Sequence, residues 1–82
     1  MSTMSTETMT NTVRAEALAL APVSASAFLD RASADAAIAQ ALVRHGGERG
    51  CAAALAHEFG ERPEAAAARM RWAGALVAEL YG

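Results

Sequence analysis

Alanine occupies 23 of the 82 positions, and this abundance limits what the chain can fold into more than any other feature. Alanine is the strongest helix former because its side chain loses no rotational entropy in a helix. It also buries little apolar surface, so the core of so short a chain is expected to be thin. Helical spacing of the larger apolar residues, without alternating strand patterns, predicts an all-α fold, a small three- to four-helix bundle.

Composition divides the chain into three segments. Residues 1–12 (MSTMSTETMTNT) are rich in Ser, Thr and Met and are predicted to form a disordered N-terminal tail. Residues 13–22 are predicted to form a short helix and linker, because Pro22 forces the residue before it out of the helical conformation. Residues 23–82 are predicted to form the helical domain.

Capping residues set the predicted start of the helical domain. Ser24 or Ser26 is expected to cap a helix that carries Phe28 and Leu29. Ser33 is a second candidate cap, and a bend is expected near it, because a straight helix would place Leu29 opposite the next aliphatic residues.

Glycine and proline set the remaining helix boundaries. The stretch Gly46–Gly50 is predicted to end one helix and to form a flexible connection to the next. Residues Glu48–Phe59 are predicted to form a third helix, which Gly60 ends. Pro63 suits the first turn of a fourth helix, because proline lacks an N–H group that this position does not need.

Charge and cysteine content limit the cellular setting. Seven arginines, no lysines and nine acidic residues give a net charge of −2, which provides no general attraction to nucleic acid or anionic membranes. Cys51 is the single cysteine, so no internal disulfide can form, and this fits a reducing compartment. No apolar run has the length of a membrane span. The sequence predicts a cytoplasmic protein without membrane association.

The residues that carry most enzyme chemistry are not arranged for it. Cys51 and His57 lie six residues apart, about 240° around a helix, and therefore on different faces. His45 and Glu58 do not complete any metal-ligand spacing with them. Gly46–Gly50 lacks the preceding strand and the Lys-Ser/Thr pair of a phosphate-binding loop. We predict that the chain is not an enzyme and has no catalytic residue, metal site or cofactor.

One pattern spans Ser26–Gly60 and combines an aromatic–aliphatic pair, an aspartate, spaced aliphatic residues and an alanine-rich segment ended by glycine. Its members are Ala27-Phe28-Leu29, Ala34-Asp35, Ile38, Leu42, Leu55-Ala56 and Gly60. The pattern resembles the Nif-eleven (nitrogen-fixation-type) leader-peptide family, although position 36 is alanine where many such leaders have proline. Leaders of that family are bound by the enzymes that modify the peptide following them.

The resemblance implies that Phe28, Leu29, Ile38 and Leu42 form or shape a surface recognised by a modifying enzyme. An amphipathic helix lying in a groove of a partner is a common mode of recognition. Residues at this spacing are equally what a packed core requires, so both interpretations stay open.

A second pattern lies over Ala53–Ala73, which resembles a helix–turn–helix, and its last part resembles the recognition helix of sigma-factor DNA-binding domains. This alternative implies a small transcription-associated regulator that binds DNA or RNA polymerase/sigma factor, with Arg62, Arg69 and Arg71 as nucleic-acid contacts. However, residues 44–82 contain five arginines and five glutamates, which leaves no net positive charge for phosphates. We do not expect nucleic acid to be the partner.

We predict a non-catalytic recognition protein, leader- or scaffold-like, that a partner enzyme binds through apolar helix faces. The predicted partner-binding residues are Phe28, Leu29, Ile38, Leu42, Trp72 and Tyr81. A third alternative is a self-associating helical protein that uses Trp72 and Tyr81 at a subunit contact of a homo-oligomer.

Overall fold

The computed structural model describes residues 9–82 and contains four helices and no strand within them. The helices are α1 (Asn11–Leu20), α2 (Arg31–His45), α3 (Gly47–Glu61) and α4 (Pro63–Tyr81). The predicted all-α class and the small helical bundle are therefore confirmed.

Helix α1 begins earlier than the sequence analysis predicted. The Oγ1 atom of Thr10 accepts a 3.1 Å hydrogen bond from the main-chain N–H of Val13, which is a standard N-cap. Asn11 and Thr12, predicted to belong to a disordered tail, are consequently the first residues of α1. Residues 1–8 of that predicted tail lie outside the described residues.

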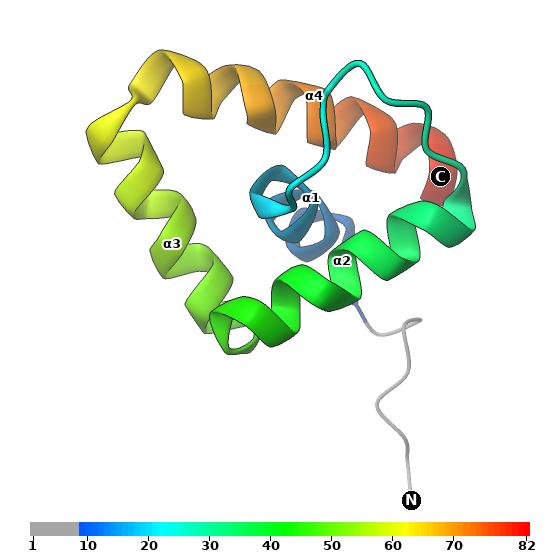
Figure 1. Ribbon diagram of the computed structural model, residues 1–82, viewed down its shortest axis with the longest axis horizontal. Coiled ribbons are helices and arrows are strands. Elements are labelled where there is room, and N and C mark those ends of the chain that lie inside the picture. The colour runs from blue at the N-terminus through cyan, green and yellow to red at the C-terminus, as the bar shows by residue number, and fades with distance from the viewer. Residues whose placement is uncertain (1–8) are drawn as a thin grey trace, which may run out of the picture.

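The four helices share one core. In Figure 1, α2, α3 and α4 form three sides of a frame, and α1 passes through its middle, seen almost end-on. Helix α1 packs against all three other helices, most extensively against α4. Helix α1, which precedes the boundary predicted at residue 23, therefore lies at the centre of the fold.

Alanine dominates this core, as its abundance predicts. Nine of the fourteen buried apolar residues are alanines, and the largest fully buried side chains are Leu18, Val77 and Cys51. Cys51 is fully buried in the apolar core, as predicted, and its thiol donates to the carbonyl oxygen of Ala41 at 3.7 Å. Because alanine side chains are short, helix backbones can approach closely, and α1 can be enclosed by its neighbours.

The α2–α3 connection is a tight corner and not the flexible stretch that was predicted. Gly46 alone joins the helices, in the left-handed conformation with φ of 82°, and α3 already begins at Gly47. Gly50 lies so close to the end of α2 that a Cβ atom there would be 1.5 Å from the carbonyl oxygen of His45. Glycine is therefore required at position 50 by the approach of two backbones.

The α3–α4 corner is equally short. Arg62 alone joins the two helices, and Pro63 is the first residue of α4, as predicted. Helix α3 does not end at Gly60 but continues to Glu61. The α1–α2 connection, residues 21–30, is thus the one long connection among the described helices.

Candidate functional site

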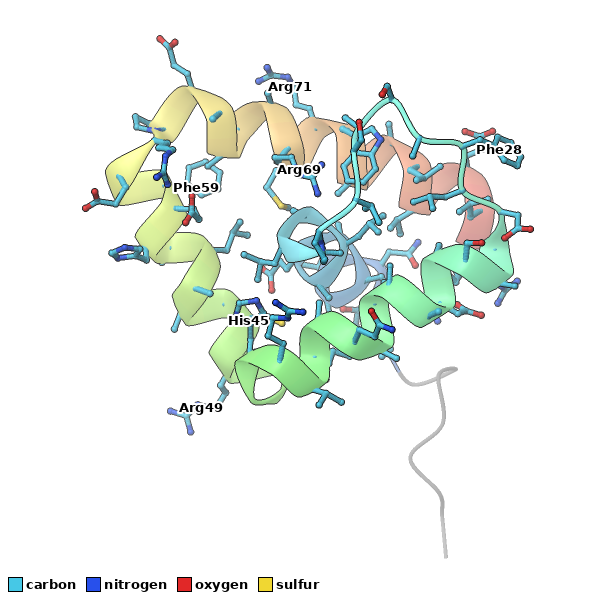
Figure 2. All side chains as sticks on the ribbon, viewed as in Figure 1. Phe28, His45, Arg49, Phe59, Arg69 and Arg71 are labelled. Carbon is cyan, nitrogen blue, oxygen red and sulfur yellow. The ribbon has the colours of Figure 1, made fainter. Side chains whose placement is uncertain are left out.

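The most exposed large apolar side chain of the described chain lies in the α1–α2 connection. Phe28 is 91% exposed, and Figure 2 shows it projecting beyond α4, away from the helices. Its neighbours Ser24, Ala25, Ser26 and Ala27 are exposed as well. Burial of a solvent-exposed aromatic ring by a partner contributes favourably to the free energy of binding.

Hydrogen bonds within the connection fix the turn before Phe28. The main-chain N–H of Ala27 donates to the carbonyl oxygen of Ser24 at 3.0 Å. The Ser24 Oγ atom accepts from the N–H of Ser26 at 3.1 Å and lies 2.8 Å from the Ser26 hydroxyl. These bonds order the backbone that leads to Phe28, which lowers the entropy lost on binding.

The structure corrects the helix that was predicted to carry Phe28. Neither Ser24 nor Ser26 caps a helix, and Phe28 and Leu29 lie outside any helix, in the connection before α2. The N-cap of α2 is Asp30, whose carboxylate accepts a 2.8 Å hydrogen bond from the N–H of Ser33. This bond holds the pKa of Asp30 below its usual value of 3.8.

The other residues of the leader-like pattern belong mainly to the core. Ile38 is 4% exposed and buried between helices. Leu29 and Leu42 are half-buried and pack against the same core. Of the four aliphatic and aromatic residues in that pattern, the structure leaves Phe28 open to a partner, and the remaining three stabilise the fold.

Trp72 and Tyr81 are partly buried, and arginine side chains contact both rings. The guanidinium carbon of Arg69 lies 4.3 Å from the centre of the Trp72 ring. Those of Arg14 and Arg31 lie 4.4 and 4.8 Å from the centre of the Tyr81 ring. Cation–π contacts of this kind hold both rings against the molecule to which they belong.

Tyr81 also joins α4 to α2 through its hydroxyl, which donates a hydrogen bond to the carboxylate of Asp35. Burial, together with this hydrogen bond and the Asp35 charge, raises the pKa of Tyr81 to about 12 from 10.0, although Arg14 and Arg31 oppose the rise. The cluster of Arg14, Arg31, Asp35 and Tyr81 therefore fastens the C-terminal end of α4 to α1 and α2.

Arg69 has a structural role that the sequence analysis missed. Its guanidinium donates to the main-chain carbonyl oxygens of Leu18 (3.4 Å), Ala19 (3.0 Å), Ala21 (2.9 Å) and Val23 (2.8 Å). It thereby satisfies the carbonyls that a helix leaves without partners at its C-terminus. Desolvation lowers the pKa of Arg69, and no salt bridge to a carboxylate is present within residues 9–82.

A signal for this cap is present in α1 itself. Helix α1 ends without a glycine in the left-handed conformation and without a basic residue in its last turn. Such an end needs a donor from elsewhere in the chain. The sequence indicates that the end of α1 requires a cap, but it does not indicate which of the seven arginines supplies it.

The three arginines of the nucleic-acid alternative lie in different environments. Arg69 is engaged with α1, as described above. Arg62 forms a salt bridge with Glu58, with a distance of 3.0 Å from Nη1 to Oε1. Arg71 is exposed and points away from the frame of helices (Figure 2). The structure therefore does not bring these three side chains together into one basic surface.

A cavity of about 340 Å³ opens where the end of α1 meets α3 and α4. Apolar side chains supply most of its wall, among them Leu20, Val23 and Leu55. Glu58 and Arg69 are the charged residues that line it. Its volume lies at the lower end of the range of about 300–1,000 Å³ for small-molecule sites.

The residues considered for catalysis or metal binding stay apart. Cys51 is buried, and burial raises the pKa of its thiol, which opposes formation of the reactive thiolate. His57 is exposed on α3. Within residues 9–82, no group of three or more His, Cys, Asp or Glu side chains is arranged to hold a metal ion.

None of the helices formed by residues 9–82 has both the length and the apolar character needed to cross a bilayer. No protein-family model, no curated protein and no solved structure matches this chain.

Proposed function

We propose that this chain is a non-catalytic recognition protein, which a protein partner binds at the α1–α2 connection with Phe28 as the anchoring side chain. The single observation that carries the proposal is the 91% exposure of Phe28 on a connection whose turn is fixed by hydrogen bonds. Aromatic anchors of this kind dominate the binding energy of many protein interfaces.

The energetics of the connection support this use. Complete burial of a phenylalanine side chain contributes about 1.5–3 kcal/mol to binding. Phe28 contributes little to the stability of the fold, because 91% of its surface is exposed to solvent. The residues before it are small, so a partner pocket can close around the ring without steric conflict.

The partner class follows from the leader-like pattern. A peptide-modifying enzyme that binds this chain as a scaffold or leader would contact the exposed Phe28 side chain directly. The buried Ile38 would act only by stabilising the fold. The partner therefore recognises one exposed aromatic side chain and not a whole apolar helix face. A pocket in the partner receives one aromatic side chain, and the flanking serines supply polar contacts.

No observation favours the two alternatives. Nucleic-acid binding requires several free cations on one surface, whereas Arg62, Arg69 and Arg71 are not brought together into one basic surface. Self-association through Trp72 and Tyr81 requires exposed rings, whereas both are partly buried against the core of their own chain and contacted by its arginines. We therefore do not propose either function.

The test compares three forms of the full chain as immobilised baits in an extract of the source cells: wild type, Phe28→Ala and Val43→Ala. Val43 is the matched control, because it is an apolar side chain on α2 that is 84% exposed. A protein retained by wild type and by Val43→Ala, and lost with Phe28→Ala, is then purified, and its affinity is measured by calorimetry.

We expect Phe28→Ala to weaken binding of the purified partner by about tenfold or more and Val43→Ala to leave it unchanged. Phe28→Leu should retain part of the affinity, because it keeps apolar volume but loses the ring. Equal affinity of wild type and Phe28→Ala for every specifically retained protein would refute the proposal.

A further inference from the structure

The cavity between α1, α3 and α4 carries an unbalanced positive charge. The Glu58 carboxylate at its wall is already paired with Arg62. The Arg69 guanidinium, which also lines the cavity, has neutral carbonyl oxygens as its hydrogen-bond partners and no carboxylate within residues 9–82. A half-buried cation of this kind attracts an anion more strongly than an exposed one does.

Arg69 also retains one hydrogen-bond donor. A guanidinium carries five N–H groups. The four hydrogen bonds to the end of α1 use the Nε group, both groups of Nη2 and one group of Nη1. Within the described chain, the second N–H of Nη1 therefore has no acceptor, so it is available to a ligand.

The remaining wall is apolar. Leu20 and Val23 come from the end of α1 and the connection after it, Leu55 comes from α3, and Ala65 comes from α4. Three helices thus contribute to one partly open surface of small and branched aliphatic side chains. Such a surface accepts a compact hydrocarbon body and offers it no polar partner.

We propose that this cavity binds a small amphipathic monocarboxylate, with its hydrocarbon body against the aliphatic wall and its carboxylate on the free N–H of Arg69 Nη1. The cavity volume of about 340 Å³ restricts the ligand to a single short chain or a single ring. The site is separate from Phe28, so it stands independently of the partner binding proposed above.

The test uses octanoate as the probe, at concentrations below those that form micelles. Octanamide is the matched ligand, because it keeps the chain and the carbonyl but has no charge. Trp72 is the single tryptophan and lies 4.3 Å from the Arg69 guanidinium, so its fluorescence reports on occupancy of the site. Calorimetry gives the stoichiometry, and the NMR signal of the Arg69 Nε–H group locates the ligand.

Two variants of α4 test whether the ligand binds in the cavity. Ala65→Leu fills the cavity from its wall, and Ala68→Leu adds the same side chain at an exposed position of the same helix that does not line the cavity. Because both positions are exposed, both variants are expected to fold. Arg69 itself is not replaced, since its loss would also release the end of α1.

We expect octanoate to bind in a 1:1 ratio with a dissociation constant on the order of 100 µM. Octanamide should bind about tenfold more weakly, Ala65→Leu should weaken octanoate by about tenfold, and Ala68→Leu should stay within about twofold of wild type. Failure of octanoate to saturate wild type in the millimolar range overturns the proposal. Equal affinity for octanamide, or equal effects of the two variants, overturns it as well.

Discussion

Arg69 on α4 donates a 2.8 Å hydrogen bond from Nη1 to the carbonyl oxygen of Val23, 46 residues earlier in the chain. Together with its bonds to the last turn of α1, this contact ties the central helix to the longest helix of the frame. A chain whose core consists mainly of alanine depends on such polar ties more than one with large apolar side chains.

Arg69→Ala is expected to lower the free energy of unfolding by about 3 kcal/mol, because four partly buried carbonyls lose a charged donor. Arg69→Lys should recover part of this loss, since an ammonium group cannot reproduce the planar set of donors. Urea denaturation followed by circular dichroism measures both. Arg71→Ala, at an exposed position two residues on, is the control and should change stability by less than about 0.5 kcal/mol. Similar losses at positions 69 and 71 would contradict the role of Arg69.

Gly50→Ala is expected to destabilise the protein by about 3 kcal/mol or more, because its Cβ would overlap the His45 carbonyl oxygen at 1.5 Å and force the α2–α3 corner open. Gly60→Ala is the matched control within α3, since no atom lies within 4 Å of a Cβ at that position. It should increase stability by about 0.5 kcal/mol, because alanine favours the helix. Thermal denaturation of both variants gives the comparison, and effects of the same sign would contradict this account of the corner.

Asp30→Ala is expected to lower the melting temperature by a few degrees, and Asp30→Asn by less, because asparagine also caps helices. The hydrogen bond from Ser33 lowers the pKa of Asp30 in the folded state. The carboxylate therefore stabilises the fold above its unfolded pKa of 3.8, and this contribution disappears as the pH falls through the folded pKa. The difference in melting temperature between wild type and Asp30→Ala should accordingly shrink on acidification below pH 3.8. A constant difference across that range would exclude the carboxylate as the source.

Tyr81 is the single tyrosine, so ultraviolet absorbance titrates it alone. We expect a pKa of about 12 in the folded protein and about 10 in urea. Because the folded pKa is the higher one, the contribution of Tyr81 to stability is complete below pH 10 and is lost as the pH rises toward 12.

Substitutions around Tyr81 should move its pKa in opposite directions. Asp35→Ala removes an anion and a hydrogen-bond acceptor and should lower the pKa of Tyr81. Arg31→Ala removes a cation that favours the tyrosinate and should raise it. Shifts of the same sign in the two variants would show that the cluster is not formed in solution.

Phe28→Ala is expected to change the free energy of unfolding by less than about 0.5 kcal/mol, because the side chain is 91% exposed. Leu18→Ala, which removes a fully buried side chain from α1, should cost about 3 kcal/mol. Chemical denaturation of the two variants measures the contrast. A large decrease in the free energy of unfolding of Phe28→Ala would mean that the ring packs on the protein and is not available to a partner.

The elements that local chemistry determines could be predicted from the sequence. Alanine content and apolar spacing indicate helices, Gly46 supplies the left-handed end of α2, and Pro63 opens α4. Each of these depends on residues a few positions apart. The start of α2 was predicted wrongly, because Ser24, Ser26 and Asp30 are all capable caps and local chemistry does not rank them.

The candidate site depends on contacts between distant segments, and these leave little trace in the sequence. Phe28 and Ile38 both fit an apolar helical pattern, yet one is exposed and the other is in the core. Periodicity cannot separate them once the backbone before Asp30 leaves the helical conformation. Likewise, the helix–turn–helix pattern predicts Arg69 as a surface contact for nucleic acid. Nothing in that pattern indicates that the end of α1 lies beside it.

The single-residue joints at Gly46 and Arg62 also determine where this protein can change in length. An added residue at either joint would rotate one side of the frame against the next and pull it off the central helix. Residues 24–28 differ from these joints, since all of their side chains face water and the connection that contains them is the long one. Insertions, epitope tags or fused domains should therefore be tolerated in that short stretch and rejected at the two corners.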